Sequence, residues 1–129
     1  RNFSVSVTAP EINATSISAG ESHTCALDNS SGIVKCWGAG GQGRLGLGDT
    51  NHRGDSANEM GSNLGFVDLG TGRTATVITS GQSHTCALLD NSDIKCWGEG
   101  DHGRLAQGNT SDISKNANEM GDNLPAIDL

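Results

Sequence analysis

The chain has 129 residues, of which 33% are hydrophobic and only 3% aromatic, and its formal net charge is −7. So low an apolar fraction argues against one large core, and the 19 glycines indicate many tight turns. The acidic balance and the lack of a Lys/Arg cluster argue against a nucleic-acid partner. The sequence contains no run of about 18 apolar residues, so no membrane-spanning segment is predicted.

Residues 1–11 match no later part of the sequence well. Val5 and Val7 alternate with polar residues in the pattern of a strand that ends at Pro10. We therefore expect this segment to be an N-terminal strand or a linker, and to open an array of repeats.

The rest of the chain contains one sequence twice. His-Thr-Cys-Ala-Leu begins at His23 and again at His84, and Lys-Cys-Trp-Gly begins at Lys35 and again at Lys95. A fixed period of this size marks a repeat architecture. We assign repeat 1 to residues 12–72 and repeat 2 to residues 73–129.

Each repeat opens with strands, and the predictions for repeat 1 recur in repeat 2. Residues 13–19 are rich in β-branched side chains and predict a strand that enters a glycine turn. A second strand is predicted at 23–27. The turn-forming residues 28–32 then lead to a third, antiparallel strand at 33–37.

The loops that follow vary more than the strands. Within the aligned loops 49–57 and 109–117, only a threonine and an alanine agree. A scaffold that repeats while its loops vary is typical of folds in which the loops determine specificity.

The two motifs, together with Gly-x-x-Gly-Arg-Leu-Gly-x-Gly at 40–48, resemble the regulator of chromosome condensation repeat family. The resemblance covers roughly residues 13–129 and is closest to the cysteine-containing form of extracellular proteins. It implies an all-β fold of two four-stranded antiparallel blades of a β-propeller. The founding member of the family is a nucleotide-exchange factor that binds chromatin. We do not expect that activity here, because the chain is acidic and no exchange-loop residues match.

Two such blades are too few to close a ring, since propellers have about four to eight blades. Each blade buries its apolar faces only against neighbours. We therefore expect partners that are other repeats of the same chain, with the array continuing beyond residue 129, or copies of the chain stacked into a ring or a filament.

The cysteines lie opposite one another in the predicted hairpins. Pairing Leu27 with Val34 places Cys25 opposite Cys36, within bridging distance. The same reasoning in repeat 2 pairs Cys86 with Cys96. The alternatives are free thiols, or a metal site to which each repeat brings only three ligands, its two cysteines and a histidine; the Cys-x₂-Cys spacing of zinc knuckles is missing. We predict two disulfides within the repeats and no metal site.

Four Asn-x-Ser/Thr triplets are candidate glycosylation sites: Asn29, Asn109, Asn13 and Asn2. The first two lie at a hairpin tip and in a variable loop, where a glycan meets only solvent. Together with the disulfides they predict an extracellular protein, secreted or at the cell surface. Unmodified triplets in a bacterial protein are the alternative.

Other repeated residues suggest structural roles. Glu59 and Glu119 are expected to accept hydrogen bonds, because an active site is normally built once. The repeated histidines, His23 and His84, are expected to pack with a ring nitrogen bonded to the backbone. The two tryptophans, Trp37 and Trp97, are expected to fill the gap between blades, with stacking on a carbohydrate as the alternative.

Two further motifs lie in the loop 49–57. Arg53-Gly54-Asp55 spells the integrin-binding tripeptide, although three-residue matches often arise by chance. Oxygen ligands for calcium are available from Asp49, Asn51 and Asp55, but the loop lacks the EF-hand pattern with its bidentate glutamate.

No nucleophile–base pair and no phosphate-binding loop stands out, so we expect neither catalysis nor a cofactor. The favoured interpretation is an extracellular, non-enzymatic structural or interaction module of disulfide-stapled propeller repeats. The first alternative is a recognition propeller that binds a protein or glycan through loops 49–57 and 109–117. The second is an intracellular exchange-factor-like regulator.

Overall fold

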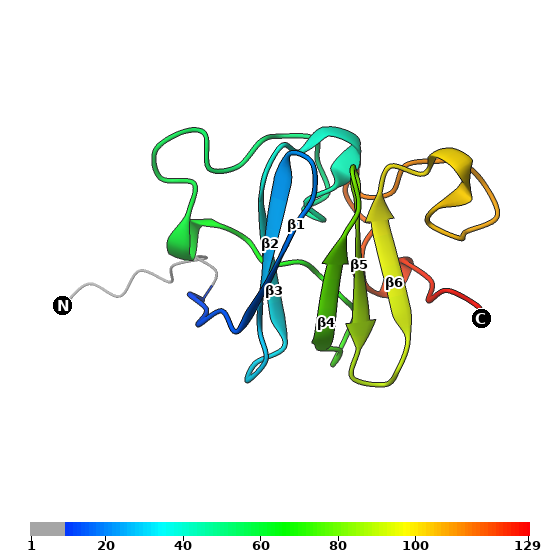
Figure 1. The fold of residues 1–129 in the computed structure, drawn as a ribbon, viewed down its shortest axis with the longest axis horizontal. Helices are drawn as coiled ribbons and strands as arrows, with labels where there is room; N and C mark the ends of the chain where they lie inside the picture. Colours follow the sequence, from blue (N-terminus) through cyan, green and yellow to red (C-terminus); the bar gives the residue numbers. More distant parts are fainter. Residues whose placement is uncertain (1–9) are drawn as a thin grey trace.

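The computed structural model describes residues 10–129, which form two antiparallel sheets of three strands each. Figure 1 shows the sheets side by side along the longest axis of the molecule, with the long loops following β3 and β6. Most of the expected N-terminal strand or linker, including Asn2, lies outside the described residues.

The sheet of repeat 1 has the strand order β1-β2-β3, with β1 at Ser16–Ala19, β2 at His23–Asp28 and β3 at Ile33–Gly38. The β2–β3 turn closes around Asp28, whose carbonyl accepts a hydrogen bond from Gly32 N at 2.7 Å. Gly32 has φ +73°, a conformation that glycine adopts without steric cost.

The sheet of repeat 2 repeats this arrangement with β4 at Ala75–Ser80, β5 at His84–Leu89 and β6 at Ile94–Gly98. Its hairpin turn is one residue shorter than that of repeat 1. Ser92, with φ +72°, provides the left-handed residue there. Two turns of different length therefore produce the same strand register.

The prediction of four strands per blade is wrong: each sheet has three. A fourth segment touches the outer edge of β3 at only two separated places. Gly38 pairs with Arg53 as an isolated bridge, and Val67 N donates to Val34 O at 2.9 Å. Between these two contacts Gly54, Asn58 and Gly61 have positive φ, which a continuous strand does not permit. Repeat 2 shows the same pattern with the isolated bridge Gly98–Ile113.

The helical segments of the described chain are 3₁₀ turns of three residues each: Gly41–Gly43, Gly61–Asn63, Asp101–Gly103 and Gly121–Asn123. None of the helices in residues 10–129 has the length and apolar character needed to cross a bilayer.

The apolar side chains form a core that crosses from one repeat to the other. Repeat 1 contributes Leu27, Val34 and Leu45, and repeat 2 contributes Leu89 and Trp97, all of them at most 2% exposed. The core is therefore shared by the two sheets.

The strand register is the one predicted from the sequence, with Cys25 opposite Cys36 and Cys86 opposite Cys96. Both pairs form disulfides, and the described chain has no free cysteine. Each bond closes one hairpin, and neither joins the two repeats.

Removing the first disulfide should weaken the fold without changing its topology. The bond spans 11 residues, and closing a loop of this length in the unfolded chain corresponds to about 2–3 kcal/mol. We expect Cys25→Ala/Cys36→Ala to lower the free energy of unfolding in urea by about that amount. Native protein should weigh about four protons less than the fully reduced chain, and tryptic peptides should show only links within repeats. Free thiols, or a link between repeats, would contradict the observed pairing.

Candidate functional site: the junction between the repeats

The two repeats pack directly against each other, and this contact is called the junction below. Its centre is Trp97 on β6, which is fully buried. Gly46 and Val67 of repeat 1 lie against the indole: a Cβ added to Gly46 lies 2.8 Å from Trp97 Nε1 and 3.1 Å from Val67 Cγ1. The side chain of repeat 2 is therefore covered by the backbone and side chains of repeat 1.

Polar bonds frame the indole. Lys95 Nζ donates to Leu69 O of repeat 1 at 3.1 Å and to Gly121 O at 2.8 Å. Gly121 N donates to Asp68 O at 2.9 Å, also across the junction. A buried ammonium needs such acceptors, because desolvation otherwise disfavours the charge. Repeat 1 supplies one of the two carbonyls.

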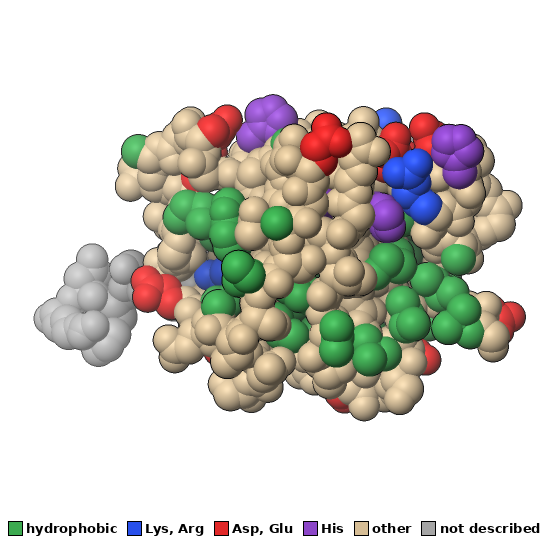
Figure 2. Space-filling view, in the orientation of Figure 1, with side chains coloured by type: hydrophobic (Ala, Val, Ile, Leu, Met, Phe, Trp, Pro, Cys, Tyr) green, Lys and Arg blue, Asp and Glu red, His purple; other side chains and the backbone are tan. Residues whose placement is uncertain are grey.

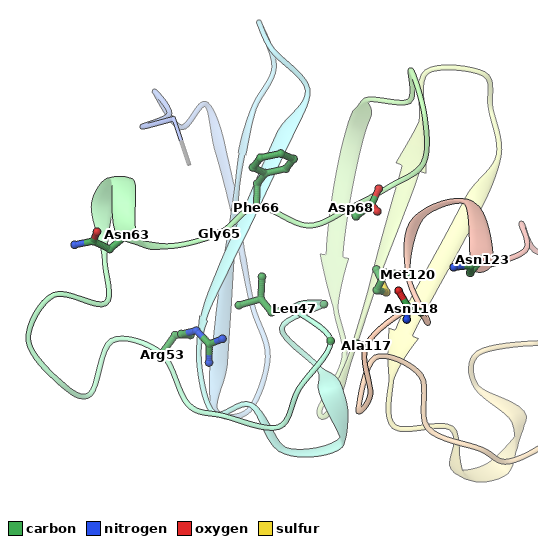
Figure 3. Close-up of a pocket in the computed structure, with 12 residues that line it drawn as sticks. Leu47, Arg53, Asn63, Gly65, Phe66, Asp68, Ala117, Asn118, Met120 and Asn123 are labelled. Atoms are coloured by element: carbon green, nitrogen blue, oxygen red, sulfur yellow. The ribbon is translucent and has the colours of Figure 1, made fainter. Parts of the chain in front are cut away.

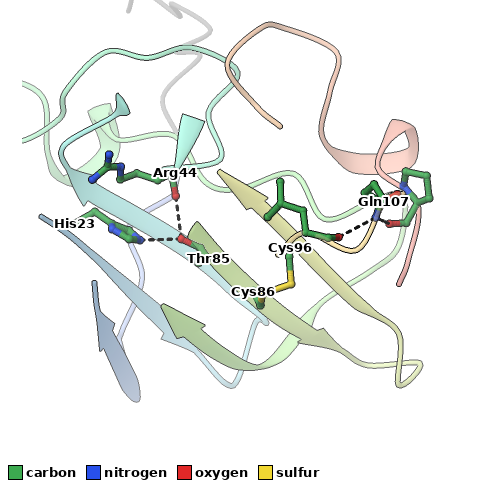
Figure 4. Close-up of a disulfide and its surroundings, with 8 residues drawn as sticks. His23, Arg44, Thr85, Cys86, Cys96 and Gln107 are labelled. Carbon is green, nitrogen blue, oxygen red and sulfur yellow. Dashed lines mark hydrogen bonds between the residues drawn. A yellow bond between two sulfur atoms is a disulfide. The ribbon is translucent and has the colours of Figure 1, made fainter. Parts of the chain in front are cut away.

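A second set of bonds crosses the junction through His23. Its Nε2 lies 2.9 Å from Thr85 Oγ1, and that hydroxyl donates to Arg44 O at 2.9 Å (Figure 4). Since the hydroxyl proton goes to Arg44 O, His23 Nε2 carries the donated proton. The expectation that the histidines bond to the backbone is wrong: His23 uses a side chain of the other repeat. Within the described residues, Nδ1 of His23 and Nδ1 of His84 have no hydrogen-bond partner.

The junction keeps its histidine neutral. Burial, followed by the positive charges of Arg44 and His84, lowers the pKa of His23 from its ordinary value of 6.5 to about 4. Burial, and then Arg104, likewise lowers the pKa of His84, while Glu99 opposes this shift. The His23–Thr85 bond therefore persists in mildly acidic solution.

Repeat 1 carries the same set of residues on its other side, and there Trp37, Met60 and Gly61 are more exposed than their counterparts in repeat 2. We call this surface the open face of repeat 1; its members are Ala26, Lys35, Trp37, Met60, Gly61 and Leu64. Trp37 is half-buried where Trp97 is fully buried, and Met60 is 42% exposed where its counterpart Met120 is 8% exposed. Lys35 Nζ donates to Gly61 O at 2.8 Å, its one acceptor in the described chain.

The open face is a shallow hollow of about 280 Å³ bordered by Glu11 and Ile12. Figure 2 shows hydrophobic side chains gathered over repeat 1, with basic and acidic groups beside them. Burial lowers the pKa of Lys35, and the nearby Glu11 carboxylate opposes this shift. The hollow thus combines apolar walls with a partly desolvated amine.

A larger groove of about 490 Å³ lies beside the junction. Figure 3 shows its walls coming from both repeats, with Arg53 and Phe66 on one side and Asn118 and Asn123 on the other. Each variable loop contributes one lining residue, Arg53 from 49–57 and Ala117 from 109–117. The groove therefore brings the two variable loops together.

The candidate glycosylation sites lie on the surface. Asn29 is exposed at the β2–β3 turn, and Asn109 is exposed in its loop. Asn13 is also exposed, and its backbone N donates to Asp28 Oδ2 at 3.2 Å. The three candidate glycosylation sites within residues 10–129 are thus all accessible to solvent.

The remaining candidates have structural bonds. Glu59 Oε1 accepts from Gly54 N and Ser56 N at 3.0 Å, and Glu119 Oε1 makes the equivalent pair of bonds, so both carboxylates hold loops as predicted. Arg53 is paired with Asp49 at 2.9 Å, so the arginine of the tripeptide and one of the three calcium candidates are bound to each other. Residues 10–129 contain no cluster of three or more metal-binding side chains.

Stacked all-β repeats that share a core are the arrangement of consecutive β-propeller blades. Residues 14–44 and 76–104 match the sequence model of the family described as Regulator of chromosome condensation (RCC1) repeat. Both segments are thus similar to the RCC1 repeat, and together they make up just under half of the chain.

Relatives of known function are much longer proteins. The ultraviolet-B receptor UVR8 of Arabidopsis thaliana is 40% identical over 108 residues, which are 83% of this chain and 22% of the receptor. The E3 ubiquitin-protein ligase HERC2 of Homo sapiens is 36% identical over 92 residues, which are 71% of this chain and 2% of the ligase. The chain thus spans about a fifth or less of the length of these relatives.

Solved structures agree on the fold. Human WBSCR16 matches with a TM-score of 0.62 and 19% identity, over 92% of this chain and 27% of that chain. Yeast RCC1 (Prp20), solved bound to Kap60, matches with a TM-score of 0.58 and 22% identity, over 88% of this chain and 25% of that chain. At these identities the likeness establishes the RCC1 propeller fold alone.

The junction histidine predicts a pH dependence of stability. The unfolded chain protonates His23 below its ordinary pKa of 6.5, whereas the folded chain resists protonation down to about 4. Stability is therefore complete above pH 6.5 and falls as the pH drops toward 4. We expect His23→Gln to make this loss smaller, because one of the two depressed histidines is removed. The variant should also lose about 1 kcal/mol at neutral pH.

The measurement is urea unfolding at several pH values between these limits. An unchanged slope in His23→Gln would contradict the assignment.

Proposed function

We propose that the chain is a non-enzymatic protein-interaction module of an RCC1-type propeller, working outside the cell. In this proposal the open face of repeat 1 binds a further repeat, and the groove beside the junction presents the variable loops to a ligand. One observation carries the proposal: the junction is complete between the two repeats, and half of it recurs unpartnered on the open face.

The matching half is specific in its chemistry. Trp37, Lys35 and Gly61 repeat the positions of Trp97, Lys95 and Gly121, which bind repeat 1 at the junction. A half-buried tryptophan and an exposed methionine lie beside an amine that has one acceptor in the described chain. These groups favour a partner with a backbone carbonyl and a small residue. Another repeat offers both.

Repeat 2 presents the complementary half. His84, the counterpart of His23, is half-buried and has an unpartnered Nδ1, as His23 has. A Cβ added to Gly43 lies 2.3 Å from the backbone of Ser114 in repeat 2, whereas its counterpart Gly103 has no atom within 4 Å of an added Cβ. The two ends of the pair are thus complementary, which supports an array of repeats. The array is either a longer chain or copies that stack into a ring or a filament.

The extracellular assignment is supported by the two disulfides and by three exposed Asn-x-Ser/Thr sites, a combination typical of oxidising compartments. The rival is an intracellular regulator. Yeast RCC1 has been solved bound to Kap60, and Prp20p has been studied for its binding to Gsp1p and histones. A net charge of −7 is electrostatically compatible with a basic partner such as a histone, so charge does not separate the two hypotheses. The disulfides favour the extracellular one, because disulfides rarely persist in a reducing compartment.

A recognition role is the second candidate, favoured by the groove. Arg53 and Ala117 come from the two loops that differ most between the repeats, and they line one hollow. Phe66 beside asparagine side chains offers an apolar surface with planar amides, which suits a peptide or a glycan. Catalysis is not proposed, because the junction histidine and the repeated glutamates already make structural bonds.

Glycans should mark the compartment. Asn29 and Asn109 are expected to be occupied before Asn13, and Asn13 before Asn2, because the first two lie on protruding turns. Peptide mass spectrometry of protein from its natural source, with and without glycosidase, measures the occupancy. Unmodified asparagine at both Asn29 and Asn109 would overturn the extracellular assignment.

A third repeat should cover the open face. In a chain in which residues 12–72 occur twice in tandem, the first copy is expected to pack on the second as repeat 1 packs on repeat 2. With Met60→Leu in the first copy, Met60 of the second copy and Met120 are the only methionines. Peroxide converts exposed methionine to the sulfoxide.

In the natural chain Met60 should be oxidised faster than Met120, in line with exposed fractions of 42% and 8%. In the duplicated chain the rate at Met60 should fall to that of Met120, as read from the masses of the tryptic peptides. A rate at Met60 that does not change on duplication would refute the docking of repeats.

A further inference from the structure

The two repeats differ at the position that touches the buried tryptophan: Gly46 of repeat 1 is Ala106 in repeat 2. Gly46 has φ +72°, and a Cβ added to it lies 2.8 Å from Trp97 Nε1 and 3.1 Å from Trp97 Cε2. Such distances force displacement, and the fully buried indole sits in a close-packed surrounding that resists it. A side chain at this position is therefore incompatible with the packing of the junction.

Ala106 bears the side chain that the junction excludes. It has φ +57°, close to that of Gly46, and it is exposed on repeat 2. In a head-to-tail contact between two copies of the chain, built like the junction, Ala106 of one copy would face Trp37 of the next. Its methyl group would then clash with the indole of Trp37.

A hydrogen bond of the junction is also missing from such a contact. Gly48 N donates to Ser114 Oγ across the junction at 2.9 Å. Repeat 1 has Gly54 at the position of Ser114, so Gly108 of a second copy would find no hydroxyl there. The missing hydroxyl belongs to the open face, so this hydrogen bond is absent with any repeat that docks there. The steric clash at Ala106 is therefore what distinguishes a second copy from other repeats.

The geometry points to one kind of occupant for the open face: an RCC1-type repeat with glycine at the position of Gly46, and not a second copy of this chain. This inference rests on the proposed function and names the partner of the same surface. Trp37, Lys35 and Gly61 on the open face are the groups that such a repeat would contact. Repeat 1 itself belongs to this kind, since it carries Gly46 and covers Trp97.

The duplicated chain tests the glycine requirement. Gly46→Ala in the first copy places the methyl group of Ala106 against Trp37 of the second copy. Gly72→Ala in the first copy is the matched control, because Gly72 has φ +70° and no atom within 4 Å of an added Cβ. Both variants therefore carry similar backbone strain, and only one meets the indole. The readout is again the rate of peroxide oxidation at Met60.

We expect Gly72→Ala to keep Met60 protected and Gly46→Ala to return its oxidation to the faster rate of the natural chain. Equal protection in both variants would overturn the glycine requirement while leaving the docking of repeats intact. Loss of protection already in the unsubstituted duplicated chain would instead refute the proposed function.

The natural chain provides the second arm. Sedimentation velocity over a range of concentrations should show a monomer, and the oxidation rate of Met60 should not depend on concentration. Dimers or longer assemblies that protect Met60 would show that Ala106 does not exclude a second copy.

Discussion

The fold depends on the packing of a tryptophan of one repeat against a glycine of the repeat before it. Trp97 is fully buried with Gly46 against its indole, whereas Trp37, in the same position of repeat 1, is half-buried. Removing a buried aromatic side chain of this size typically costs about 3–5 kcal/mol. A large part of the stability of repeat 2 therefore resides in its contact with repeat 1.

The polar groups follow the same rule. Lys95 is buried and obtains one of its two acceptors from Leu69 across the junction. Thr85 accepts from His23 and donates to Arg44, so its hydroxyl is satisfied only when both repeats are in place. Buried groups of this kind are costly when unpaired. The hydrogen bonds therefore make the relative position of the repeats specific, beyond what apolar contact alone would determine.

With 33% hydrophobic residues, the chain has few apolar side chains for a core. Part of the packing between the repeats is instead made by glycines, which allow close approach. At Gly43 an added Cβ would lie 2.3 Å from the backbone of Ser114, and at Gly121 2.3 Å from the Asp68 carboxylate. These close approaches let the backbones of the two repeats touch without intervening side chains. Together with the disulfides, they support a fold whose apolar core is small.

Local patterns predicted much of this structure. The hairpin register, the cysteine pairs and the role of Glu59 follow from alternation and from repeated positions, because they involve residues close in sequence. The absent fourth strand could not be anticipated, since Asn58 and Ser114 take positive φ although neither is glycine.

Contacts between repeats were also beyond local patterns. The partner of His23 is 62 residues away, and the two tryptophans share one motif yet differ in burial because only one has a preceding repeat beside it. The difference at Gly46 and Ala106 is visible in the aligned repeats, but its meaning requires knowing what the residue touches. The sequence shows that the two residues differ, and the structure shows that the difference lies against a buried tryptophan.

Each disulfide lies within its own hairpin, and neither of them joins the two repeats. A duplication or deletion of one whole repeat in the gene would therefore add or remove cysteines in pairs, and never strand an unmatched thiol in an oxidising environment. Arrays of this kind can change their length during evolution without passing through mispaired intermediates. What limits such changes is the single residue that each new neighbour places against the tryptophan.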